Sequence, residues 1–498
     1  MENMSRENLY TITINDNGAN LYIREFNGLV SYVYDDSLSF LVPVTKVLLN
    51  GDVIEVFIFT KKYFSIDNGI INRYSLLSST EVRNIGMMLS NENDDYTKNE
   101  AHFNRSGLMI DGRVNTELHT HLIEILTSNG FLDFINKFNG EVLLNESGVI
   151  DFRNGSPFNV DQIRSLPQLH SMVLEQLEIP INRTGDFEEL ERKVENRTRM
   201  LLGIADKYSV DTAMGDMDSS RVLVTKVLLH DSLVYLRDSN VKYVEVSHSN
   251  VRIINRVLDS LDEEFFNDIS GIQFRFLISS SRLKSAKDFR QSGRYLEAAL
   301  ENQAVVGFDI MGLESKFSEA DLDINSRDSL YRKIYPILST LSKYNNSVLR
   351  LHSGEFVDTD ANTEQLLEVL LLIEKELGIR IPPPEIRIGH GLHINQNDRL
   401  VSLIKHFDCI VEINASSNFA LGNVTDLSEI PYKFYLDNGI KVVVSTDGGG
   451  FYKTSSEQEK YIAKTFIGND DLDRLFKCDE EIYQNKIGGV IHDKSAGR

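Results

Sequence analysis

The feature that most restricts the fold is an alternation of short apolar runs with longer segments of helical period, beginning at about residue 108. The runs have the length and composition of β-strands, and there are eight of them: Val114–His119, Lys242–Val246, Ile272–Ile278, Val305–Ile310, Ser347–His352, Glu385–His390, Cys409–Asn414 and Lys441–Ser445. Between two of these runs, Thr363–Leu377 has apolar residues at intervals of three and four and is followed by Gly378, as expected of a helix with a C′ glycine. The pattern is typical of parallel strands joined by crossover helices.

Eight units of strand and helix favour a (β/α)8 barrel, or TIM barrel, over a doubly wound sheet. Polar residues lie at or just beyond the C-terminal ends of the runs: His119, His121, Glu245, His352, His390, Asn414 and Asp447. In a barrel these ends converge on one mouth. The expected fold class is therefore α/β, with the polar residues gathered at one end of the barrel.

The first hundred or so residues have a different pattern, with short β-branched and aromatic runs such as Tyr10–Ile14 and Val53–Phe59. The polar stretch Ser90–Arg105 that follows has the composition of a linker. We therefore expect a β-rich N-terminal domain and linker over 1–107 and a barrel over 108–498. An insertion at about 122–240 is too long for a simple crossover, and we interpret it as a lid or an oligomer contact.

Composition limits the partners. Lysine and arginine number 52 against 74 acidic residues, a net charge of −22 that repels nucleic acid polymers and anionic membranes. Cys409 and Cys478 are the two cysteines, too few for a disulfide framework or a thiolate metal cluster. The sequence shows neither a signal peptide nor a run of about eighteen apolar residues. We expect a cytoplasmic protein without a membrane or nucleic acid partner.

Histidines at the ends of these runs suggest a metal site. His119 and His121 are two positions apart on an extended segment, so both imidazoles point the same way and can reach one ion. His352 ends another run, and His390 ends the next between two glycines that allow close backbone approach. Such nitrogen ligands suit Zn²⁺ or another divalent first-row ion.

Two carboxyl groups complete this set. Asp447 ends the last run and precedes three glycines, which lack the lysine and the spacing of a phosphate-binding P-loop. Glu355 follows His352 by three residues, in the turn that leaves the strand, where an acid can face a metal-bound water without being a ligand. Three histidines and Asp447 leave a position for water, which outlines a hydrolytic centre.

Seven motifs, in consistent order over about 108–470, resemble the adenosine deaminase family of the amidohydrolase superfamily. They are Glu-Leu-His-x-His-Leu (Glu117–Leu122), Tyr-x-Glu-Val (Tyr243–Val246), Val-Val-Gly-x-Asp-x-x-Gly-x-Glu (Val305–Glu314), His-x-Gly-Glu (His352–Glu355), Arg-Ile-Gly-His-Gly (Arg387–Gly391), Ser417-Asn418 and Ser445-Thr446-Asp447. The resemblance implies that Glu355 is a proton shuttle, that His390 orients the water and helps to deprotonate it, and that Gly312 makes a backbone contact to the purine edge. It also implies four metal ligands: His119, His121, His352 and Asp447.

The resemblance implies a metal-dependent hydrolytic deaminase with one divalent ion, Zn²⁺ in the first instance. Its expected substrate is an aminopurine, as an adenine nucleoside or (deoxy)nucleotide, converted to the hypoxanthine form with release of ammonia. Two departures bear on the substrate, because Gly448 and Ile123 stand where the family commonly has aspartates that contact the purine N7 and the ribose. Metal chemistry is retained and nucleoside recognition is altered.

Two alternatives remain open at this point. The same centre could hydrolyse another amidine or amide. The chain could instead be an assembly component of a bacterial anti-phage system, with altered or weak deaminase activity. Residues 1–107 could also mediate homo-oligomerisation or bind a protein partner in a chain that is catalytically active.

Overall fold

The computed structural model describes residues 114–179, 187–211, 217–314, 326–378, 385–467 and 469–487, together with strands between Glu7 and Ile71. These early strands are β1 (Glu7–Ile14), β2 (Ala19–Phe26), β3 (Leu29–Ser31), β4 (Leu41–Leu49), β5 (Asp52–Phe59), β6 (Ile66–Asp67) and β7 (Ile70–Ile71). They pair antiparallel as β1-β2-β3, β4-β5 and β6-β7. The expected linker Ser90–Arg105 lies outside the described residues, and the division into domains stays a prediction.

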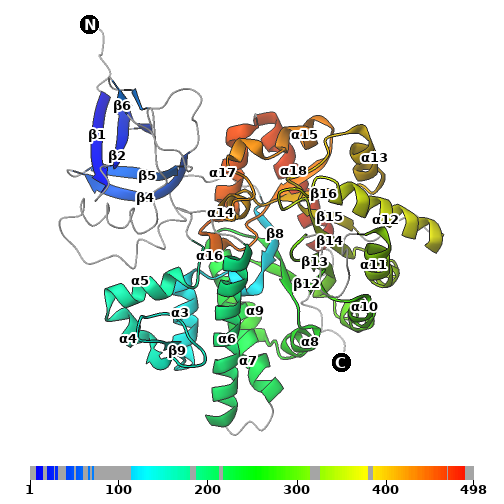
Figure 1. The fold of residues 1–498 in the computed structure, drawn as a ribbon, viewed down its shortest axis with the longest axis horizontal. Helices are drawn as coiled ribbons and strands as arrows, with labels where there is room; N and C mark the ends of the chain where they lie inside the picture. The colour runs from blue at the N-terminus through cyan, green and yellow to red at the C-terminus, as the bar shows by residue number, and fades with distance from the viewer. Residues whose placement is uncertain are drawn as a thin grey trace.

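Eight parallel strands form the centre of the molecule, and helices surround them (Figure 1). The strands are β8 (Thr116–His121), β11 (Tyr243–His248), β12 (Gln273–Ser281), β13 (Val305–Met311), β14 (Val348–Ser353), β15 (Glu385–His390), β16 (Ile410–Ile413) and β17 (Lys441–Val444). Each one pairs with the next in chain order. The expected fold class, an α/β barrel, is confirmed.

Backbone pairing between the first and last strands closes the barrel. Thr120 and Asp447 form a parallel bridge, in which the Asp447 N–H donates to the His119 carbonyl (2.9 Å) and the His121 N–H donates to the Asp447 carbonyl (3.2 Å). This closure extends β8 to His121, two residues beyond the end expected from its apolar pattern. It also fixes the segment that carries Asp447 against the segment that carries both histidines.

The helices that follow the strands cover the outside of the barrel. They are α8 (Val251–Asp259), α9 (Glu263–Asp268), α10 (Ala286–Leu300), α11 (Arg327–Leu341), α12 (Asn362–Leu377), α13 (Asp398–His406), α14 (Ala415–Ala420), α15 (Tyr432–Asp437), α16 (Gly449–Tyr452), α17 (Ser456–Phe466) and α18 (Asn469–Ile487). The expected helix over Thr363–Leu377 coincides with α12, which ends at Gly378 with a left-handed φ of 65°. Their apolar faces pack on the strands in one large core.

The segment between β8 and β11 has its own secondary structure, which includes two long helices that contact each other (Figure 1). Its elements are η1 (Leu122–Glu124), α3 (Ser128–Lys137), β9 (Glu141–Leu144), β10 (Ser156–Asn159), α4 (Val160–Arg164), α5 (Pro167–Glu175), α6 (Phe187–Asp211) and α7 (Met217–Asp238). The expected helix over Phe187–Ala205 is the first part of α6. The role of the insertion as a lid or an oligomer contact stays a prediction.

Buried Arg197 of α6 joins the insertion to the mouth of the barrel. Its guanidinium donates to the carbonyls of Leu177 (2.9 Å), Ile123 (2.9 Å) and Leu126 (2.8 Å). The group also lies over the ring of Phe451, 4.6 Å from its centroid. Three chain segments therefore share one charged group, which holds η1 in place directly after β8.

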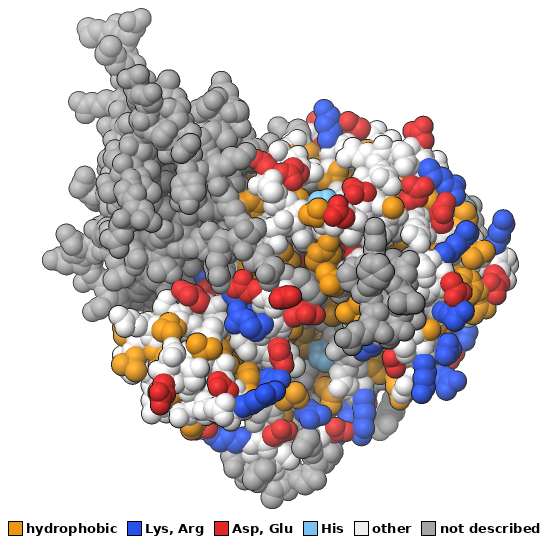
Figure 2. Space-filling model, in the orientation of Figure 1, with side chains coloured by type: hydrophobic (Ala, Val, Ile, Leu, Met, Phe, Trp, Pro, Cys, Tyr) orange, Lys and Arg blue, Asp and Glu red, His pale blue; other side chains and the backbone are white. Residues whose placement is uncertain are grey.

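Charged side chains of both signs are interspersed on the face of the barrel that Figure 2 shows. No helix in the described part of the chain is both long and apolar enough to cross a membrane.

Candidate metal centre

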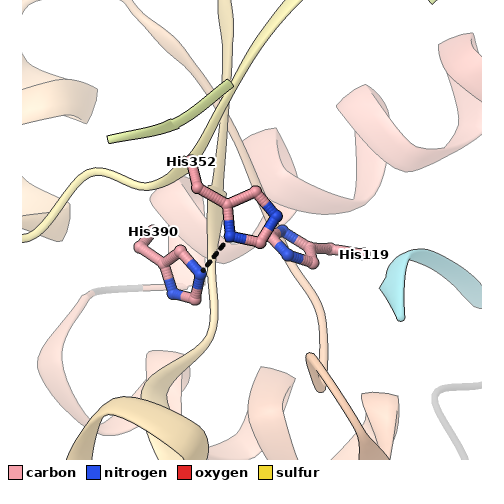
Figure 3. A group of neighbouring side chains, drawn as sticks. All are labelled: His119, His352 and His390. Carbon is pink, nitrogen blue, oxygen red and sulfur yellow. Dashed lines mark hydrogen bonds between the residues drawn. The ribbon is translucent and has the colours of Figure 1, made fainter. Parts of the chain in front are cut away.

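Four histidines and two aspartates meet at the carboxyl end of the barrel. Their ligand atoms form three overlapping triplets, and within each triplet all atoms lie within 4.8 Å of one another: His119, His352 and His390; His119, His121 and Asp447; His121, Asp309 and His352. Figure 3 shows the first triplet, in which the His352 and His390 rings make a hydrogen bond of 3.2 Å. Because the triplets share members, they mark one centre.

The two histidines of β8 lie on the same side of their strand. Nε2 of His119 and Nε2 of His121 are each 3.5 Å from Oδ1 of Asp447. The rings of His119 and His352 stand 4.6 Å apart between centroids. The structure therefore brings together all four residues that the family resemblance assigns as metal ligands.

Unsatisfied polar atoms show that the centre suits a cation. Nε2 of His119 is buried and makes no hydrogen bond within the described chain, and neither do Nε2 of His352 and Oδ1 of Asp309, although these two atoms face each other at 3.2 Å. Buried polar atoms are nearly always satisfied, so atoms in this state call for a further partner. Imidazole nitrogens and carboxylate oxygens are the donor set of divalent first-row ions, and the residues present fit such an ion.

An ionic network beneath the centre orients His119. Its Nδ1 lies 3.0 Å from Oε2 of Glu412, and that oxygen accepts a hydrogen bond from Nε of Arg350 (2.7 Å). Burial, and then the positive charge of Arg350, hold the pKa of His119 well below its usual value. A neutral imidazole whose Nδ1 faces a carboxylate presents Nε2 to a metal.

His390 ends β15 in a left-handed conformation, with a φ of 68°. Its Nδ1 is 3.2 Å from Nδ2 of Asn418, and burial lowers its pKa to about 3. The neighbouring Gly389 leaves room for the cluster, because a Cβ there would lie 2.8 Å from Cε1 of His119. His390 is therefore a neutral imidazole, held from behind by Asn418.

Glu355 lies beside the two histidines that point toward it. Its Oε2 is 3.6 Å from Nε2 of His390 and 4.0 Å from Nδ1 of His352. Its backbone N–H donates to Oε2 of Glu314 (2.8 Å), which fixes the turn after β14. Burial, and then the charges of Asp447 and Glu314, raise the pKa of Glu355 well above its usual range. Its surroundings therefore favour the uncharged acid over the carboxylate.

Comparison with known proteins agrees with this arrangement. The profile of the adenosine deaminase family matches residues 384–477, which include His390 and Asp447. Adenosine deaminase from Plasmodium gallinaceum is 30% identical over 151 residues, which is 30% of this chain and 36% of that protein. Adenosine deaminase from Plasmodium knowlesi is 22% identical over 363 residues, which is 72% of this chain and 79% of that protein. In sequence the chain is therefore similar to adenosine deaminases.

Among solved structures, the N6-methyl-AMP deaminase from Arabidopsis thaliana is similar to this deaminase-like chain. The sequence identity is 16% and the TM-score 0.46, over 76% of this chain and 96% of the other.

Gly312, expected to contact the substrate, follows β13 of the deaminase-like barrel. It has a positive φ of 98°, a conformation that L side chains rarely adopt. Asp309, three residues earlier and fully buried, has Oδ1 3.2 Å from Nε2 of His352. No role was predicted for Asp309 from the sequence, although a polar residue close to the end of a strand was the available signal.

Glu124 of η1 is a further carboxyl group at the mouth, and it was not predicted from the sequence. Burial raises its pKa to about 7. Burial lowers the pKa of neighbouring His121, but the hydrogen bond to Asp447 and the charge of Glu124 outweigh it and bring that pKa to about 9. No sequence motif singles out Glu124, because its place depends on the path of η1 after β8.

Proposed function

We propose that the chain is a metal-dependent hydrolytic deaminase of a 6-aminopurine. The substrate is an adenine nucleoside or (deoxy)nucleotide, which is converted to the hypoxanthine form with release of ammonia. The observation that carries this proposal is the pairing of Glu355 with His390, 3.6 Å apart, beside a cluster of unsatisfied metal-ligand atoms. An acid and a base next to a Lewis-acid site are what hydrolysis of a cyclic amidine needs.

The proposed ligands of one divalent ion, Zn²⁺ in the first instance, are His119, His121, His352 and Asp447. Such an ion, when bound, lowers the pKa of a coordinated water toward about 7, so that a nucleophile exists at neutral pH. Asp309, 3.2 Å from His352, orients that imidazole and balances the positive charge of the centre.

The protein residues move the protons. As the water oxygen adds to C6, His390 takes a proton from the water, and Glu355 gives its proton to N1. The proton held by His390 then passes to the amino group, the C6–N bond breaks, and ammonia leaves with the electron pair. As the C6 carbonyl forms, the proton that remains on the C6 oxygen passes to Glu355, whose Oε2 lies 3.6 Å from Nε2 of His390, and both residues return to their starting states. A neutral base and an uncharged acid are the protonation states that this sequence requires.

The substrate is proposed to differ from unmodified adenosine. Gly448 and Ile123 supply no carboxylate where the family resemblance places two. At position 123, beside the expected place of the ribose, isoleucine brings no negative charge that would repel a substrate phosphate. This favours a nucleotide, a deoxynucleotide or another aminopurine.

The test is ammonia release by the purified full-length protein. The panel is adenosine, deoxyadenosine, adenine, and the mono-, di- and triphosphates of both nucleosides, with Glu355→Gln as the matched control. We expect turnover of at least one compound by the wild type and a loss of about 10²-fold or more in the variant. Metal-loaded wild-type protein that releases no ammonia from any of them would contradict the proposal and favour another amidine or amide, or an assembly role.

A further inference from the structure

Glu124 and Gly448 compete for one space at the mouth of the barrel. A Cβ on Gly448 would lie 2.6 Å from Oε2 and 2.7 Å from Cβ of Glu124, distances that real side chains do not show. The backbone itself does not require glycine there, because the φ of Gly448 is −166°, which any residue adopts. The glycine next to Asp447 is therefore explained by the glutamate that fills its side-chain position.

The surrounding structure holds Glu124 in this place. Arg197 donates to the carbonyls of Ile123 and Leu126, on either side of it. Glu124 is only 7% exposed, and the charges of His121 and Arg197 act on its carboxyl group. A carboxyl group that is fixed in this way at the mouth is suited to a hydrogen bond with a ligand that enters there.

Glu124 and Glu355 lie toward different parts of the cluster. Glu355 faces His352 and His390, whereas Glu124 adjoins the segment after Asp447. In a purine, C6 has two ring neighbours, N1 and C5, and N7 is bonded to C5. With C6 at the centre and N1 at Glu355, the N7 edge of the ring points away from Glu355.

We propose that Glu124 recognises the N7 edge of the substrate purine by donating its carboxyl O–H to N7, in the space that a side chain at position 448 would otherwise occupy. This inference rests on the proposed deaminase function and names the residue that sets its ring specificity. This space has room for one carboxyl group, which can come from position 124 or from position 448 but not from both. The chain supplies it from η1, the first turn after β8, and leaves position 448 as glycine.

The first test compares a purine substrate from the panel with its 7-deaza analogue, in which a C–H replaces N7. We expect kcat/KM of the wild type to favour the purine by about tenfold or more, the scale of a lost hydrogen bond that leaves a buried polar group unpaired. Glu124→Ala should reduce that preference to within about twofold while metal content stays unchanged. Glu124→Gln should keep most of it, since the amide can still donate one hydrogen bond. Glu141→Ala, at an exposed glutamate of the same insertion, is the control and should behave as the wild type.

The second test moves the carboxyl group to the other position. Gly448→Asp alone should lower Tm and activity, because two side chains then occupy one space. The exchange variant Glu124→Gly/Gly448→Asp should regain both Tm and the preference for the purine. Glycine is needed at position 124 in this variant, because the Glu124 Cβ alone would lie 2.7 Å from the new side chain.

These results separate the inference from the function on which it rests. Equal purine preference in the wild type and Glu124→Ala would overturn the role of Glu124, while loss of turnover in Glu355→Gln would still support the deaminase. A wild type that deaminates no aminopurine would overturn both. A Gly448→Asp variant as stable as the wild type would overturn the competition for space.

Discussion

Gly389 supports His119 by having no side chain. A Cβ at Gly389 would lie 2.8 Å from Cε1 and 3.3 Å from Nδ1 of the His119 ring. Nδ1 of that ring also lies 3.0 Å from Oε2 of Glu412, so the ring cannot move away without losing this contact. The glycine that precedes His390 is therefore part of the metal centre.

Gly389→Ala should displace His119 and weaken metal binding by about 10-fold or more, the scale seen when support of a metal ligand is lost. The measurement is metal content after dialysis against a graded series of chelator concentrations. Gly203→Ala is the control, because a Cβ at Gly203 in α6 meets nothing within 4 Å. Equal retention of metal by Gly389→Ala and the wild type would show that the ring is free to adjust.

The protein should bind about one divalent ion per chain, because the three ligand triplets share members. Replacement of both His119 and His121 by alanine should abolish binding. Elemental analysis of protein purified without added metal, followed by titration with Zn²⁺, measures both. Wild-type protein without transition metal and without uptake would contradict the assignment of the centre.

Glu355→Gln should lower turnover by about 10²-fold or more with nearly unchanged metal content and Tm. The amide keeps the size of the acid but cannot carry a proton to N1. Single-turnover kinetics and elemental analysis on the same preparation separate the loss of proton transfer from the loss of metal. Near wild-type turnover of the variant would contradict the proposed mechanism, although the barrel and the metal centre would still stand.

Stability should fall as the pH rises through about 7, in part because of Glu459. Burial raises the pKa of this carboxyl group to about 7, above a usual value of 4.5, although backbone N–H groups of Ala415 and Ser416 donate to it. The folded state therefore favours the protonated acid. This contribution to stability is fully present below pH 4.5 and is lost as the pH rises through 7.

Glu459→Gln should remove this part of the pH dependence, which is at most about 3 kcal/mol. The measurement is the free energy of unfolding in urea at pH 5 and pH 8 for the variant and the wild type. Glu117 also has a pKa raised to about 7 by burial, so some dependence should remain in the variant. Parallel loss of stability in both proteins would show that Glu459 does not titrate in this range.

The sequence was sufficient for the barrel because each strand has a continuous local pattern. The observed β15 has the bounds that the pattern predicted, and most other strands differ from prediction by one to three residues at an end. The differences arise from long-range pairing. His121 belongs to β8 because its N–H donates to the Asp447 carbonyl, across more than three hundred residues of chain.

The supporting residues of the centre were harder to predict. Glu412 lies within a buried strand and orients His119 through an ion pair with Arg350, from another strand. The sequence around Glu412 does not distinguish it from a buried glutamate whose ion pair only stabilises the fold. Similarly, the relation between Glu124 and Gly448 exists only once the barrel has closed, because it joins the first strand to the last.

Arg197 has a consequence for how this protein can change over evolutionary time. One guanidinium sets the path of the chain between Ile123 and Leu126, whereas the metal-site histidines and Asp447 are held by the closed barrel itself. Substitutions in this short junction can therefore alter which ring edge is read without disturbing the hydrolytic chemistry. Substrate selectivity and hydrolytic chemistry therefore depend on different parts of the chain. We expect changes of substrate selectivity to arise in the insertion that holds the junction.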